Sequence, residues 1–170
     1  MQLVLPNWEH EAMVMNYRAA FKAAGDKPYG ASGLLRYVSY SDWLDRCRNA
    51  SNEETCEEGR VPQTVYIAID NDEMVGAVVL RYKLNDDLLK YAGHMAFSVH
   101  PKMRRRGYGK QILGAAVNMC RDKGIDKVLL TCDKDNIASK HLIESCGGAL
   151  ENEIMLGDKP VLRYWINTGR

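Results

Sequence analysis

The segment 104–110 has the composition and spacing of a phosphate-binding loop. Arginine side chains carry a fixed positive charge and a fork of donors that suits phosphate oxygens. The glycines that follow permit a backbone that a Cβ would obstruct, so that backbone N–H groups can approach an anion. The R-x-x-G-x-G pattern therefore predicts that this loop holds a pyrophosphate. The residues expected to take part are Arg104, Arg105, Arg106, Gly107, Tyr108, Gly109 and Lys110.

A run of arginines can also be an ordinary solvated surface, and a glycine pair an ordinary turn, so the flanking elements matter. Residues 94–100 alternate like a strand, and residues 110–123 carry apolar side chains at helical spacing. A strand, a glycine turn and a helix start together present free N–H groups and a positive dipole end to a phosphate. The loop is not a dinucleotide fingerprint, because Ile112 stands where the third glycine would be, and no G-K-[ST] of a P-loop follows.

The bulk composition narrows the class of protein. A chain of 170 residues is most simply one domain, 1–170, with room for a hydrophobic core. With 23 basic and 22 acidic residues, no overall field would attract nucleic acid or an anionic membrane. No apolar run approaches the roughly 20 residues of a membrane helix, and residues 1–6 lack the features of a signal peptide. We therefore expect a cytoplasmic protein with no nucleic-acid or membrane partner.

The cysteines and histidines give no template for a metal site. Five cysteines and four histidines are scattered, and no C-x-x-C pair occurs, so we expect no bound metal. Most cysteines are expected to be reduced residues in or near the core. Cys132, at the end of a predicted strand, is the one that could serve as a nucleophile, with core packing as the alternative.

The remaining elements must position the loop. The predicted order is α-α-β-β-β-α-β-α-β-β, which suits an α+β domain with a mixed sheet. Asn7 is expected to cap the first helix, and Ser41 or Asp42 the second. Residues 25–39 are predicted to form a loop, and residues 49–62 a polar surface segment. The predicted helices are 8–24, 42–47 and 110–123. A fourth helix is expected to be capped by Asp135 or Asn136 and to end at 147–148. The predicted strands are 64–70, 74–82, 94–100, 127–133, 149–156 and 161–166.

Two motifs within residues 64–166 resemble those of the GCN5-related N-acetyltransferases. The segment 99–109, V-H-P-K-M-R-R-R-G-Y-G, follows that family's V-x-P-x-x-R-x-x-G-x-G pattern closely. The segment 133–139 matches the asparagine, Asn136, that opens the helix after the next strand. Residues 84–85, 91–94 and 130–136 further resemble a little-described subgroup of predicted acetyltransferases.

The resemblance implies a fold, a cofactor and a reaction. The fold would be a three-layer α/β arrangement whose mostly antiparallel sheet contains one splayed parallel strand pair, between which acetyl-CoA binds. The reaction would be direct transfer of an acetyl group to a primary amine of a small molecule or a peptide, and family habit also implies a homodimer. A catalytically weak or inactive CoA-binding module is the alternative. Besides the loop, the resemblance assigns acetyl-CoA contacts to Phe97, Ser98, Val99, Asn136 and Ser139.

The chain departs from the family pattern at the proton donor. The tyrosine that usually protonates the CoA thiolate falls on Ile143, and Gly148 stands where an aromatic or apolar residue is usual. Because a thiol pKa is near 8.5, the leaving group can depart as a thiolate without a dedicated acid. Alternatively, Tyr164 or Tyr91 could donate the proton; packing is the competing interpretation for both.

The base and the acceptor contacts are also open. His94 is the candidate base because its ordinary pKa suits proton transfer. It shares the strand face of Ala96 and Ser98, however, so the family's usual placement would require a β-bulge, and a structural histidine is the alternative. Asn85 is the candidate for holding the acceptor, against a simple turn residue. The acidic residues of 53–58 and 86–87 would favour a cationic amine, if they are more than solvated surface.

Overall fold

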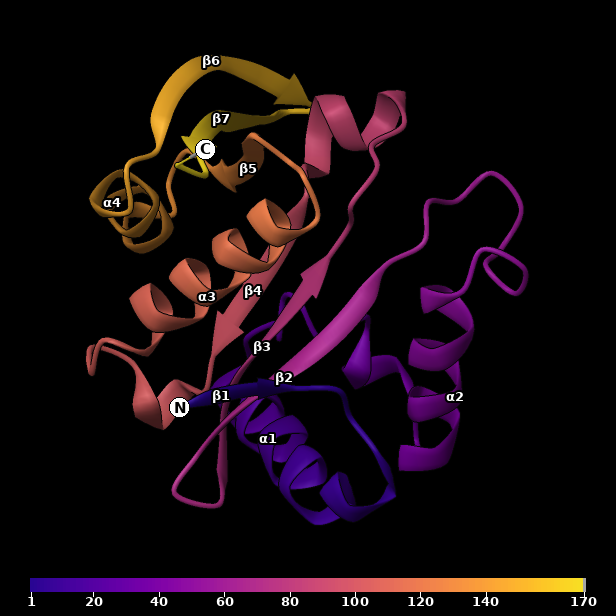
Figure 1. The fold of residues 1–170 in the computed structure, drawn as a ribbon. Coiled ribbons are helices and arrows are strands. Elements are labelled where there is room, and N and C mark those ends of the chain that lie inside the picture. Colours follow the sequence, from indigo (N-terminus) through magenta and orange to yellow (C-terminus); the bar gives the residue numbers. More distant parts are fainter. Residues whose placement is uncertain (170) are drawn as a thin grey trace.

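The computed structural model describes residues 1–169, which form two antiparallel sheets and their covering helices (Figure 1). The first sheet has the order β1 (Gln2–Val4), β2 (Thr64–Asp70), β3 (Glu73–Leu80), β4 (Met95–Val99). The second has the order β5 (Lys127–Asp133), β7 (Lys159–Asn167), β6 (Ala149–Leu156). The α-helices are α1 (Glu11–Ala24), α2 (Tyr40–Ser51), α3 (Tyr108–Asp122) and α4 (Ile137–Ser145).

Two apolar clusters on opposite faces of the first sheet hold the layers together. In Figure 1, α1 and α2 cover one face of this sheet and α3 the other. Strand β3 is buried along nearly its whole length, as its continuous apolar sequence requires for a strand covered on both faces. Val78 and Leu80 belong to the cluster under α3, whereas Ala77 and Val79 belong to the cluster under α1 and α2. The result is the α+β layered architecture that the sequence predicted.

The two sheets are linked where β4 begins. The backbone N–H of His94 donates to the carbonyl oxygen of Leu129 at 2.9 Å, and the N–H of Leu129 donates to Nδ1 of the His94 ring, also at 2.9 Å. The His94 carbonyl is not available for Leu129, because it accepts from Arg81 N–H at 2.8 Å. An imidazole thus takes the place of a backbone acceptor in the ladder. Beyond this link β4 pairs with β3 and β5 with β7, so the expected splayed pair belongs to two separate sheets.

Most predicted elements are confirmed, with three corrections. Helix α2 is longer than the predicted 42–47 and extends into the predicted polar segment 49–62, as far as Ser51. Strand β1, whose three residues pair with the end of β2, was not predicted, because so short a strand has no periodicity. Ser39, and not Ser41 or Asp42, caps α2: its hydroxyl accepts from Asp42 N–H at 3.2 Å. The predicted cap Asn7 is confirmed, although it opens a short 3-10 turn (Trp8–His10) that leads into α1.

Short helical turns complete the connections. They are Leu34–Arg36 between α1 and α2, a π-helical turn Leu88–Ala92 before β4, and Pro101–Met103 after it. Within residues 1–169, no helix is both long enough and apolar enough to cross a bilayer.

Gly93 tests how far the fold depends on the link between the sheets. Its φ is 68° and a Cβ at this position would lie 2.3 Å from the Leu129 carbonyl oxygen. We expect Gly93→Ala to lower the free energy of unfolding by about 3 kcal/mol, from backbone strain and the displaced β5 backbone together. Chemical denaturation measures this.

Gly25→Ala is the matched control for Gly93→Ala. Gly25 also has a positive φ, 63°, but open space surrounds the position of its Cβ. The free energy of unfolding of Gly25→Ala should fall by only about 1 kcal/mol, the cost of an alanine in the left-handed backbone region. Equal losses in the two variants would contradict the importance of the link.

Candidate functional site

The edge of β4 that faces β5 is the first part of the site. In the antiparallel pairing with β3, Arg81 N–H bonds the His94 carbonyl and His100 N–H bonds the Val75 carbonyl, each at 2.8 Å. Because hydrogen-bonding direction alternates along a strand, the backbone groups of Phe97 and Val99 point away from β3. No ladder continues on that side within residues 1–169. An extended ligand could therefore pair with this edge, as the sequence analysis expected for Phe97 and Val99.

Ser98 lies differently from its two neighbours. Its backbone faces β3, and its hydroxyl donates to the Tyr29 carbonyl oxygen and shares a 2.9 Å hydrogen bond with the Tyr17 hydroxyl. These bonds tie the segment after α1 onto β4. The side chain of Ser98 therefore braces this segment, and the structure does not bring it to the free edge.

The loop after β4 ends in a helix start with no side-chain cap. Gly107 is the N-cap of α3, with φ 85° in the left-handed region, and no side chain caps this helix. The first N–H groups of a helix have no intrahelical partner, and the dipole is positive at this end. The backbone of Tyr108 to Lys110 is therefore free to bind an anion at the place that the motif predicted.

The three arginines of the loop have separate environments. Arg104 forms an ion pair with Asp26 at 2.5 Å, places its guanidinium 5.7 Å from the Phe21 ring centroid and donates to the Val99 carbonyl at 3.4 Å. Its hydrogen bond lowers the pKa of the Asp26 carboxyl below the ordinary value. Arg105 and Arg106 are exposed, and neither forms an ion pair within the described residues. Arg106 donates to the Met103 sulfur at 3.4 Å, and neither side chain is held by a carboxylate, whereas Arg104 braces β4 against the end of α1.

Two residues of the loop have additional structural roles. A Cβ on Gly109 would lie 2.8 Å from Cδ2 of Leu142, so this glycine lets α3 pack closely on α4. The Tyr108 hydroxyl donates to Asp70 at 2.7 Å and ties the start of α3 to β2. For both residues it is the backbone N–H that remains available to a ligand.

Asn136 begins α4, as the second motif predicted. Its side-chain oxygen accepts from Ser139 N–H at 3.1 Å, which makes Asn136, and not Asp135, the cap. The N–H of Ser139 is therefore already used within the cap. A cavity of about 250 Å³ adjoins this turn and is lined by Asp133, Lys134, Asp135, Lys159 and Pro160.

His94, the candidate base, is held at the link between the sheets. The ring is buried, and Nδ1 accepts a hydrogen bond, so the proton of the neutral ring lies on Nε2. Burial lowers the pKa of His94 below its ordinary value. The pairing of β3 with β4 is regular over its whole length, and it has no bulge that would move His94 to the other face. This geometry favours a structural role, and proton transfer by His94 stays a prediction.

The candidate proton donor Tyr164 and the candidate nucleophile Cys132 are buried in the core, whereas the other candidate donor, Tyr91, is half-buried. The Tyr164 hydroxyl donates to Glu144 at 3.1 Å, and burial followed by this bond raises the pKa of Tyr164 to about 12. Ile143 is also in the core, and a Cβ on Gly148 would lie 2.4 Å from its Cγ2, so the two departures from the family pattern fit one another. Burial raises the pKa of the Cys132 thiol to about 11, which disfavours the thiolate that a nucleophile needs.

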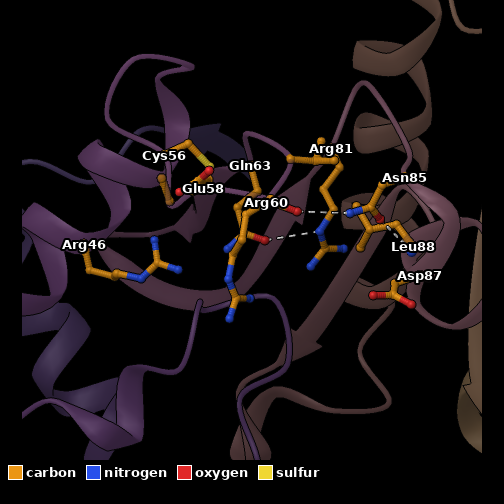
Figure 2. A pocket seen from close by; sticks show the side chains of 12 residues that line it. Arg46, Cys56, Glu58, Arg60, Gln63, Arg81, Asn85, Asp87 and Leu88 are labelled. Atoms are coloured by element: carbon orange, nitrogen blue, oxygen red, sulfur yellow. Dashed lines mark hydrogen bonds between the residues drawn. The ribbon is translucent and has the colours of Figure 1, made fainter.

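Two cavities lie on the α1 and α2 side of the first sheet. One, of about 400 Å³, lies between residues 27–36 and the strands β3 and β4, with Val79, Arg81 and Ala96 in its wall. The other, of about 350 Å³, adjoins it and is shown in Figure 2. Asn85 lines this second cavity, but its side-chain oxygen already accepts from Leu88 N–H at 3.0 Å.

The part of the site that Arg81 and residues 27–36 form is not predicted by the sequence. The glycines and proline of 25–39 indicate only a loop, and Arg81 only the end of a strand. The single available signal is the charged residue that ends the apolar run of β3. No group of three or more metal-ligating side chains is found within residues 1–169.

Comparison with known proteins finds similar sequences and similar structures. The model of the acetyltransferase (GNAT) family matches residues 34–148, which include the β4 edge, the glycine loop and Asn136. N-alpha-acetyltransferase 30 of Xenopus laevis is 26% identical over 106 residues. That match covers 62% of this chain and 36% of the relative, so the chain spans little more than a third of that protein.

Solved structures share the fold over nearly the whole chain. Ribosomal-protein-S5-alanine acetyltransferase from Vibrio fischeri has a TM-score of 0.74 and 12% identity, with 99% of this chain and 93% of that chain covered. RimJ of Mycobacterium smegmatis, solved with a CoA disulfide, has a TM-score of 0.72 and 14% identity, with 97% and 80% covered. With the family model matching well over half of its residues, the chain belongs to the acetyltransferase (GNAT) family.

Proposed function

We propose that this protein transfers the acetyl group of acetyl-CoA to a primary amine of a small molecule or a peptide. One observation carries the proposal: the free edge of β4 leads directly into the Gly107-capped start of α3. An extended pantetheine arm and a pyrophosphate require these two features, in this order along the chain. The relatives named as acetyltransferases, and the neighbour solved with CoA, add support.

The residues of the site fit acetyl-CoA. Backbone groups of Phe97 and Val99 would pair with the pantetheine amides, and the N–H groups of 108–110 with the pyrophosphate. Arg105 and Arg106 would add charge-assisted hydrogen bonds to phosphate oxygens. Asn136 and Ser139 would contact the ligand from α4, where the cap leaves the amide nitrogen of Asn136 available.

The chain's own contribution to the reaction is mainly orientation. Acetyl-CoA supplies the acetyl group as a thioester that a neutral amine can attack. The β4 backbone N–H groups can stabilise the charge that develops on the carbonyl oxygen, and a fixed amine gains from proximity. Tyr164 remains a proposed proton donor, although its hydroxyl is bonded to Glu144. A thiolate of ordinary pKa can depart without such a donor.

A second candidate function is CoA binding without catalysis. The observation that favours it is the buried Ile143 at the position where the family pattern has a tyrosine. Release of thiol from acetyl-CoA, measured against pooled small amines, polyamines, aminoglycosides and peptides, separates the two. Amine-dependent release supports the enzyme. A rise in melting temperature with acetyl-CoA but no release supports the binding module.

Gly107 tests the phosphate loop. We expect Gly107→Val to remove the rise in melting temperature that acetyl-CoA produces, because its positive φ and small size shape the anion-binding turn. At a ligand concentration 100 times Kd, the wild type should gain about 2.7 kcal/mol, a shift of several degrees. Thermal denaturation with and without acetyl-CoA measures both.

The control for Gly107→Val is Gly147→Val, at the end of α4. Gly147 has φ 86° and open space around its Cβ position, so both variants carry the same backbone strain. Only the Gly107 variant should lose the response to the ligand. A full response in Gly107→Val would refute the phosphate loop.

His94→Asn separates the two roles of His94. Asn Oδ1 can accept from Leu129 N–H as Nδ1 does, but it cannot take up a proton at neutral pH. We expect kcat to stay within a few-fold of wild type. A fall of about 100-fold or more at unchanged melting temperature would instead assign proton transfer to His94.

The same variant should change the dependence of stability on pH. The folded pKa of His94 lies below the unfolded value of 6.5, so the unfolded state binds the proton more readily. The contribution of the neutral ring is complete above pH 6.5 and declines as the pH falls below it. Urea denaturation across this range should show a shallower slope in His94→Asn. His100, whose pKa is also lowered by burial, contributes to the slope that remains.

A further inference from the structure

The cavity of about 400 Å³ lies directly behind the β4 edge that is proposed to bind the cofactor. Side chains alternate along β4, so that Phe97 packs with the α3 cluster and Ala96 faces the α1 and α2 side. The segment after α1 is pressed onto this face: a Cβ on Gly30 would lie 2.4 Å from the Ala96 carbonyl oxygen. A ligand in this cavity would therefore reach the strand from the face opposite α3.

The charged side chains that line this cavity are all basic. They are Lys27, Arg36 and Arg81, and its wall contains no carboxylate. None of the three forms an ion pair within residues 1–169. The cavity is thus a poor environment for a polyamine or another acceptor with several positive charges, and a good one for an anion.

Arg81 is the central residue of the three. Its Nε donates to Gln63 Oε1 at 3.2 Å and its Nη1 to the Gly93 carbonyl at 3.4 Å, and both acceptors are neutral. Burial lowers its pKa, although a guanidinium remains charged. A desolvated cation is ordinarily matched by an anion. Three of the five N–H donors of this guanidinium remain to bind one.

The neighbourhood also orients Arg81. Gln63 donates to the hydroxyl of Ser32 at 3.2 Å while it accepts from Arg81, so it connects the segment after α1 to the guanidinium. Arg81 N–H bonds the His94 carbonyl, which places Arg81 beside the link between the sheets. The charge is therefore held in one direction, next to the strand on which transfer is proposed.

The neighbouring basic residues, in contrast, already have partners. Figure 2 shows Arg46, Arg60 and Arg81 in the adjoining cavity of about 350 Å³. Arg60 and Arg46 both contact Glu57, at 2.7 and 3.5 Å. Glu58 and Asp87 also line this cavity, but neither forms an ion pair with Arg81. Arg81 belongs to both cavities and is the one guanidinium of the three that lacks a carboxylate in the part of the chain described.

Two of the acidic residues that suggested a cationic amine are also paired with basic side chains. Glu53 forms an ion pair with Lys83 at 2.5 Å, and Glu57 is held by Arg46 and Arg60. These two carboxylates therefore attract a cationic acceptor less strongly than the sequence alone suggests.

We propose that the acceptor is a small amine that also carries an anionic group, a carboxylate or a phosphate, and that Arg81 binds this group. This inference rests on the proposed function and names the class of its acceptor. Lys27 and Arg36 add to the positive field at the same cavity. Arg81 is a specificity-determining residue in this proposal: it selects the acceptor and takes no part in proton transfer.

The test compares acceptors that differ only in the distal charge. We would measure kcat/KM for ω-amino carboxylates of increasing chain length, the matching aminoalkyl phosphates and the matching diamines. The wild type should prefer one of the anionic series over the diamines by about 10-fold or more. Which anionic series is preferred identifies carboxylate or phosphate. A preference for diamines, or equal use of all three series, would overturn the inference.

Arg81→Gln tests the assignment to this residue. It should lower kcat/KM for the preferred anionic amine by about 10- to 100-fold, mainly through KM, and leave the diamines nearly unchanged. The Kd for acetyl-CoA should not change. Arg60→Gln is the matched control, because Arg60 lines the adjoining cavity and is already paired with Glu57. Equal loss for anionic amines and diamines would mean that Arg81 acts only through its contact with Gly93.

A second variant keeps the test decisive if Arg81→Gln does not fold. Arg36→Gln removes one of the other two charges at the cavity, from a residue with no ion pair in the described chain. It should reduce the preference for the anionic series several-fold.

The two proposals fail in different ways. If acetyl-CoA binds and amines are acetylated without preference for an anionic group, only the acceptor inference fails. If acetyl-CoA binds and no amine in any series is acetylated, the acceptor inference fails and the binding module remains. If acetyl-CoA does not bind, the proposed function itself fails.

Discussion

The pair of hydrogen bonds between His94 and Leu129 is the constraint on which the site depends. In a continuing ladder the Leu129 N–H would bond a β4 carbonyl, but here the imidazole accepts it and the His94 carbonyl stays with β3. The His94 ring reaches farther than a backbone carbonyl would, so it bridges the gap between the two strands at this one point. Beyond it, β4 and β5 belong to different sheets. Gly93 makes the contact sterically possible, since any Cβ would meet the Leu129 carbonyl.

An open strand edge is ordinarily a liability, because unpaired N–H and C=O groups need partners or water. This chain has such an edge on β4 in the interior of the fold and braces it from its other sides. Ser98 holds the segment after α1, Arg104 holds Asp26, and Gly109 brings α3 against α4. Arg104 reaches this edge only at the Val99 carbonyl, and the braces leave the rest of the edge unoccupied. Preorganisation of this kind is what binding an extended ligand requires.

The sequence predicted the parts of the site that are local in the chain. The start of α3 at Gly107 and the cap at Asn136 depend on residues within one turn, and motif and backbone chemistry determine both. The contacts that could not be predicted join distant segments. The bond of His94 to Leu129, the position of Tyr164 against Glu144 and the cavity at Arg81 all arise from packing that no periodicity encodes.

The near-zero net charge shows the limit of arguing from composition. A balance of 23 basic and 22 acidic residues correctly indicates that no global field exists, yet it says nothing about where charges are paired. Arg105 and Arg106 are free beyond the end of β4, and Arg81 is free of ion pairs at its beginning. Asp26 and Glu57, in contrast, are bound to other bases. Local pairing, rather than total charge, therefore leaves a cationic site at each end of the strand where transfer is proposed.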